Sequence, residues 1–73
     1  MSRLIRLDRS GHTTLAEWSP ADTAAQARAV DAFRRELENG MLASATRDGG
    51  AEVVRELPLD AELVIVRRPI AGG

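Results

Sequence analysis

The chain has 73 residues, of which 44% are hydrophobic and 29% are charged. A chain of this length buries only about 60% of its unfolded surface, so it has little room for a deep active-site cleft beside its core. We therefore expect one folded domain that is not an enzyme. Cysteine is absent and His12 is the single histidine, so disulfides and thiolate chemistry are excluded and no metal site or bound cofactor is expected.

The charge and the N-terminal segment limit the classes of partner. A formal net charge of -1, with one Trp and one Phe, argues against nucleic-acid binding. Residues 1–6 lack the apolar core of a signal peptide, and no run reaches membrane-spanning length. We expect a cytoplasmic protein with no membrane partner. Lysine is absent and every basic residue is Arg, a bias that genome composition alone would explain.

The first half of the chain predicts a hairpin and a helix. Residues 3–8 and 12–18 have strand-like patterns on either side of Arg9-Ser10-Gly11, which has the residue types of a turn. Helix-start signals follow in residues 19–22: Ser19 as cap, Pro20 at the first helical position and Asp22 in the capping-box place. The helix is expected to end at Asn39-Gly40, where glycine permits a left-handed stop.

The second half predicts another hairpin and a final strand. Residues 41–47 and 51–57 flank Asp48-Gly49-Gly50, whose glycines permit a tight turn. Residues 62–68 are apolar enough to be buried on both faces, as in a central strand. Pro69 lacks a backbone N–H and ends that strand.

This order of elements predicts an α+β domain in which one helix packs on a mixed sheet. Residues 1–68 would form the domain and residues 69–73 a flexible tail. The helix face that carries Arg34-Arg35-Glu36 is expected to face solvent. The expected core consists of eight apolar side chains: Ile5, Leu7, Leu15, Val30, Phe33, Leu37, Val64 and Val66.

Two side chains invite a functional interpretation that the sequence does not favour. His12 has Asp8 nearby, yet no nucleophile or oxyanion site can be assigned around it. Trp18, at a strand-to-helix junction, is more often a lid on the core than a binding anchor. We predict that neither carries chemistry and that there are no catalytic residues.

The end of the sequence is unusual because Gly72 and Gly73 do not stabilise a fold. They bury no side chain and lose much conformational entropy when ordered. A carboxylate at the end of such a segment can enter a narrow channel in another protein. Ile70 to Gly73 would reach about 13 Å beyond the strand. By itself this signal is weak, since chance or truncation also leaves two glycines.

Together, the layout and the terminal Arg67-Arg68-Pro69-Ile70-Ala71-Gly72-Gly73 resemble the ubiquitin-like β-grasp superfamily over essentially the whole chain. Residues 58–73 look like the end of the molybdopterin-synthase small subunit, a sulfur carrier. Residues 7–13, with Trp18, Pro20 and Arg55-Glu56-Leu57, look more like bacterial ubiquitin-like proteins from operons that encode activating, conjugating and deconjugating enzymes. The second resemblance is favoured.

The resemblance implies that a ubiquitin-activating-type partner uses ATP to adenylate the carboxylate of Gly73. A modifier would then pass to target proteins, through conjugating enzymes and subject to deconjugating ones, whereas a sulfur carrier would form a thiocarboxylate for molybdopterin- or thiamine-type biosynthesis. Gly72, Ala71 and Ile70 would contact the activating enzyme. A third alternative is an interaction module that is not conjugated.

Two further expectations concern contacts with partners. Without lysine, a second copy could be attached only to the α-amine or to hydroxyls such as Ser2, Ser10, Ser19 and Ser44. Strand alternation places Leu63, Ile65 and Arg67 on the sheet face away from the helix, with Leu4 and Arg6 expected to join them. That face, together with Arg68, is a candidate partner surface; burial by oligomerisation and ordinary scattered surface residues are alternatives.

Overall fold

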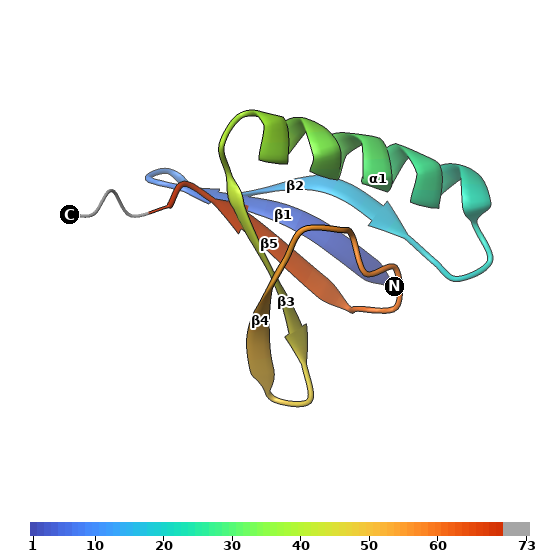
Figure 1. Ribbon diagram of the computed structural model, residues 1–73. Helices are drawn as coiled ribbons and strands as arrows, with labels where there is room; N and C mark the ends of the chain where they lie inside the picture. The colour runs from blue at the N-terminus through green and yellow to red at the C-terminus, as the bar shows by residue number, and fades with distance from the viewer. Residues whose placement is uncertain (70–73) are drawn as a thin grey trace.

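The computed structural model describes residues 1–69, with the side chain of Arg47 left out. Each half contributes a hairpin, and the helix lies between the two hairpins in the sequence (Figure 1). The order predicted from the sequence is therefore confirmed. The elements are β1 (Ser2–Asp8), β2 (Gly11–Trp18), α1 (Thr23–Glu38), β3 (Leu42–Arg47), β4 (Gly50–Val54) and β5 (Leu63–Arg67).

The strands form one five-stranded mixed sheet in the order β2-β1-β5-β3-β4. β5 runs parallel to β1 and antiparallel to β3, so the last strand lies in the middle of the sheet. In Figure 1, α1 crosses one face of the sheet over β1 and β2, while the β3–β4 hairpin extends away from the helix. This is the α+β, β-grasp arrangement expected from the sequence.

The start of the helix differs from the expectation. The cap is Asp22, whose side chain accepts a hydrogen bond from the Ala25 amide at 2.9 Å. Ser19 lies in the preceding turn instead, where its carbonyl accepts from the Asp22 amide at 3.1 Å. That turn separates Ser19 and Pro20 from the helix, so a carboxylate takes the capping role that the sequence pattern assigned to a hydroxyl.

The end of the helix follows the prediction. Gly40 has a φ of 84°, a left-handed conformation that glycine adopts without a Cβ penalty. The Gly40 amide donates to the Leu37 carbonyl and the Met41 amide to the Glu36 carbonyl, both at 3.0 Å. These two bonds form a Schellman motif and direct the chain from α1 into β3.

The core lies between α1 and the sheet. Small residues on the helix, Ala25 and Ala29, are buried there, which allows the helix to approach the strands closely. Trp18 is also buried, and its indole N–H donates to the Leu59 carbonyl at 3.0 Å. The lid interpretation of Trp18 is therefore correct. The largest fully buried side chains are Trp18, Phe33, Leu4, Val64 and Val66.

Some core predictions were wrong. Leu7 is 39% exposed, whereas Leu4 is completely buried. β1 alternates, so Leu4 and Arg6 face the helix while Ile5 and Leu7 face the other side. Ile5 is nevertheless buried, with 8% exposure, as predicted. Leu15 and Leu37 pack at the margin of the core, and Val30 is only half-buried.

The second hairpin is confirmed, with the turn at Asp48 and Gly49. Their φ angles are 47° and 80°, and positive values at both central positions match the right-handed twist of a two-residue hairpin. Gly50 already belongs to β4 and pairs with Arg47.

The other edge of β3 pairs with β5. Ala43 lies opposite Val66 and Ala45 opposite Val64, which fixes the central position of β5.

Candidate functional site

The four residues that carry the predicted acyl chemistry lie outside the described part of the chain. They are the attachment residue Gly73 and the predicted recognition residues Gly72, Ala71 and Ile70. Pro69 is the last described residue; it is exposed and follows β5 after Arg68. The structure therefore locates the point from which these residues continue, at the end of the central strand.

The predicted partner residues on β5 do face away from the helix. Val64 and Val66 are completely buried, while Leu63 and Ile65, which alternate with them, are half-buried on the opposite face. The expectation that β5 would be buried on both faces is therefore wrong for the described residues. Arg67, the next residue on this face, is exposed.

Neighbouring strands extend this face, but not with the residues expected. Leu4 and Arg6 lie on the helix side, so their predicted membership was wrong. Their neighbours Ile5 and Leu7 take that place, and Ile5 pairs directly with Ile65. Across β3, Ser44 pairs with Ile65. We call the surface formed by Ile5, Leu7, Leu63, Ile65 and Arg67 the open sheet face.

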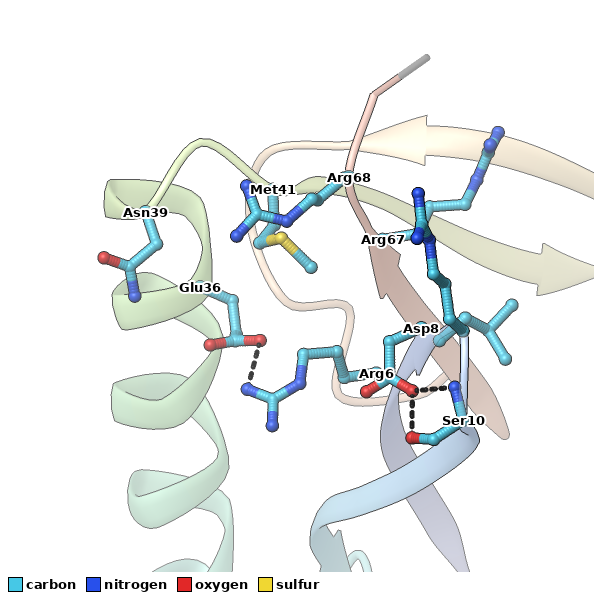
Figure 2. Close-up of a pocket in the computed structure, with 10 residues that line it drawn as sticks. Arg6, Asp8, Ser10, Glu36, Asn39, Met41, Arg67 and Arg68 are labelled. Carbon is cyan, nitrogen blue, oxygen red and sulfur yellow. Dashed lines mark hydrogen bonds and ion pairs between the residues drawn. The ribbon is translucent and has the colours of Figure 1, made fainter. Parts of the chain in front are cut away.

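A concave surface adjoins the end of β5. Its walls come from the β1–β2 turn, the end of α1 and the last residues of β5, and four of its residues are arginines (Figure 2). We call it the arginine groove. It is lined by Arg6, Leu7, Asp8, Arg9, Ser10, Glu36, Asn39, Met41, Arg67 and Arg68.

One ion pair crosses the groove. Arg6 Nη1 lies 3.3 Å from Glu36 Oε1, and the Glu36 side chain is only 11% exposed. The expectation that Glu36 would lie on the solvent face of the helix is therefore wrong. The signal that could have placed Glu36 is the alternation of side chains along β1. Because Leu4 faces the helix, Arg6 must face it too, and a guanidinium group on that side needs a carboxylate partner.

Asp8 is held within its own turn. Its Oδ1 accepts from the Ser10 hydroxyl at 2.6 Å and from the Ser10 amide at 2.9 Å. The hydroxyl bond, followed by the amide bond, lowers the pKa of Asp8 below its ordinary value of 3.8. The carboxylate is therefore charged at neutral pH and has its acceptor positions partly occupied by Ser10.

His12, the single histidine, does not line the arginine groove. His12 is exposed at the start of β2 and pairs in register with Leu7. Within residues 1–69 there is no group of three or more His, Asp or Glu side chains that could hold a metal ion. In the same range, α1 lacks the length and apolar character that would let it span a bilayer.

Comparisons with protein-family models, with characterised proteins and with solved structures found no match to this chain. Two features of this chain's own fold bear on its function: the central position of β5, from which residues 70–73 continue, and the two surfaces that adjoin β5.

Proposed function

We propose that the protein is a ubiquitin-like modifier whose Gly73 carboxylate is adenylated by a ubiquitin-activating-type enzyme and then joined to target proteins. The observation that carries this proposal is the position of β5. It is the central strand, paired with β1 on one side and β3 on the other. A segment anchored in this way presents its continuation from a fixed point, which suits delivery of a terminal carboxylate into a partner's active site.

The chemistry is supplied by the partner. A carboxylate oxygen of Gly73 attacks the α-phosphorus of ATP, and pyrophosphate leaves to give the acyl adenylate. A partner thiol then displaces AMP to form a thioester, and an amine or hydroxyl of the target displaces that thiol to form an amide or ester. The modifier contributes its carboxylate and its binding surfaces, so it acts as a carried substrate.

The open sheet face is the proposed surface for the enzymes that handle the modifier. The half-buried Ile65 gives it an apolar centre, beside Ile5, which is buried with 8% exposure, and Arg67 gives it a charged margin. An apolar centre with a polar rim is the usual composition of a protein interface. Conjugating and deconjugating enzymes are the further partners that we propose for this surface.

The absence of lysine limits how copies of the modifier could be joined. Among the candidate hydroxyls, Ser2 is buried with 9% exposure, and Ser19 and Ser44 are half-buried, whereas Ser10 is exposed. Ser10 is therefore the most accessible of the four. We expect single modification, with Ser10 or the α-amine as the acceptor if chains form.

The decisive experiment is intact-mass analysis of tagged protein recovered from its native cells. The matched control lacks Gly72 and Gly73 and leaves every described residue unchanged. Covalent adducts on larger proteins, present with the full chain and absent with the shortened one, are the expected result. An unmodified mass in both samples would contradict the proposal and favour an interaction module that is not conjugated.

A second candidate function is a sulfur carrier with a terminal thiocarboxylate. The Pro69-Ile70-Ala71-Gly72-Gly73 sequence favours it, because it resembles the end of the molybdopterin-synthase small subunit. The same mass measurement separates the two candidates. A carrier would be recovered as a monomer in which one oxygen is replaced by sulfur, with no adducts on other proteins.

A further inference from the structure

The arginine groove has a charge opposite to that of the whole molecule. Four arginines and two acidic residues line it, which gives a formal charge of +2, whereas the whole chain carries -1. The four arginines come from both ends of the chain, and the parallel pairing of β1 with β5 brings them together. The positive charge is therefore a product of the fold.

The charges in the groove are not equally available. Glu36 is the partner of Arg6, and Asp8 accepts two hydrogen bonds from Ser10. Arg9, Arg67 and Arg68 make no ion pair with another described residue, and all three are exposed. Figure 2 shows Arg67 and Arg68 at the end of β5, with Arg6 reaching towards Glu36 on α1. Three guanidinium groups therefore remain for an external anion.

The surroundings of these guanidinium groups favour carboxylates on a peptide over a phosphate. The helix end beside the groove is the C-terminal end of α1, where no free helix amides point outward to hold a phosphate. The half-buried Met41 and the partly exposed Leu7 add apolar surface to the lining. Guanidinium forks match carboxylates, and the apolar surface matches an aliphatic side chain.

We propose that the arginine groove binds a short acidic segment of a partner protein, with alternating carboxylate and aliphatic side chains. The carboxylates pair with Arg9, Arg67 and Arg68, and an aliphatic side chain packs on Met41, which lies on the helix side of the sheet. The inference goes beyond the proposed function, since binding of this kind needs no acylation of Gly73. It can therefore be tested on the unmodified chain.

The test is an NMR titration of the full chain with a short peptide of alternating glutamate and leucine. The matched peptide has glutamine in place of glutamate. We expect the glutamate peptide to shift the amides of the groove and the glutamine peptide to leave them unchanged. The affinity should fall as salt is added, because exposed charge pairs are screened.

Two double variants localise the binding. Arg67→Gln with Arg68→Gln removes two positive charges from the groove, and the affinity should fall about tenfold or more. Arg28→Gln with Arg34→Gln removes the same charge from exposed positions on α1 outside the groove, and the affinity should be retained. Circular dichroism confirms that both variants are folded.

Three results would overturn the inference. The first is no shift with the glutamate peptide, or shifts confined to Ile5, Leu63 and Ile65, the residues of the open sheet face that do not line the groove. The second is an equal loss of affinity in the two double variants, which would indicate only general attraction to a basic chain. The third is that inorganic pyrophosphate shifts the same amides with an affinity equal to that of the peptide, which would make the groove a site for small anions.

Discussion

Arg6 and Glu36 join β1 to the last turn of α1 through a contact of 3.3 Å between Nη1 and Oε1. The two residues are thirty positions apart in the sequence, and the pair is unequally exposed, with 38% of the Arg6 side chain and 11% of the Glu36 side chain accessible. The carboxylate is therefore the partner that depends on the contact, because it has less access to water.

We predict that Arg6→Met destabilises the fold by about 1 to 3 kcal/mol, because it keeps the aliphatic stem but leaves the Glu36 carboxylate nearly buried without its cation. Adding Glu36→Gln should recover part of the loss, since a neutral amide costs less to leave unpaired. Urea unfolding of the two single variants and the double variant measures the coupling. Strictly additive effects would show that the pair contributes nothing.

Trp18 joins β2 to the connection between β4 and β5 through its bond to the Leu59 carbonyl. Replacement by Phe removes the indole N–H and leaves that carbonyl without this donor, so we expect a loss of about 1 to 3 kcal/mol. The loss should be measured by circular dichroism, because the variant has no Trp for fluorescence. In the unaltered chain, blue-shifted emission should report the 1% exposure of Trp18.

Phe33 and Leu7 were both predicted to be core residues, and only Phe33 is buried in the core. Phe33 is 1% exposed and Leu7 is 39% exposed. Phe33→Ala should cost about 3 to 5 kcal/mol, as for other buried aromatic residues, which could remove most of the stability of so small a domain. Leu7→Ala should cost less than about 1 kcal/mol. Thermal unfolding compares them, and similar losses would contradict the assignment of Leu7 to the open sheet face.

The elements were more predictable than their contacts. Local signals decided the hairpin turns, the Asn39-Gly40 helix end and the central strand, because turn and cap chemistry acts over a few residues. The side of the sheet that Leu4 and Leu7 face depends instead on the register of β1 against β5, which pairs opposite ends of the chain. A slip of one residue reverses every side chain of a strand. The same reversal concealed the approach of Arg6 to Glu36.

In the candidate site, too, local features could be predicted from the sequence and contacts between distant segments could not. Leu63, Ile65 and Arg67 were placed on the correct face because alternation along one strand is a local property. The arginine groove was not foreseen, because it needs three segments that are distant in sequence: the β1–β2 turn, the end of α1 and the end of β5. No spacing pattern in the sequence relates Arg9 to Arg68.

Gly49 should be sensitive to substitution for a backbone reason alone. Its φ is 80°, and an added Cβ would meet nothing within 4 Å, so Gly49→Ala introduces no clash with another residue. The left-handed conformation should still cost about 1 to 2 kcal/mol. Urea unfolding measures this cost, with Ala51→Gly in the same hairpin as a control for altered strand propensity. An unchanged midpoint for Gly49→Ala would indicate that the turn had changed its conformation.

The hydrogen bonds from Ser10 to Asp8 should produce an acid-side dependence of stability. They lower the pKa of Asp8 in the folded state below its ordinary value of 3.8. When the folded-state pKa of a carboxyl group is depressed, its charged form stabilises the folded protein. This contribution to the free energy of unfolding is present at pH values above the unfolded-state pKa and is lost as the pH falls through the folded-state pKa. Ser10→Ala removes the hydroxyl bond, the larger cause, and should move the pKa of Asp8 upward while the amide bond remains. Carboxyl-detected NMR titration of the two proteins measures that shift directly. A pKa of Asp8 that is identical in both proteins would show that the hydroxyl does not stabilise the carboxylate. Asp8→Asn removes the titrating group, so it should abolish the contribution of this turn to the acid-side dependence of stability.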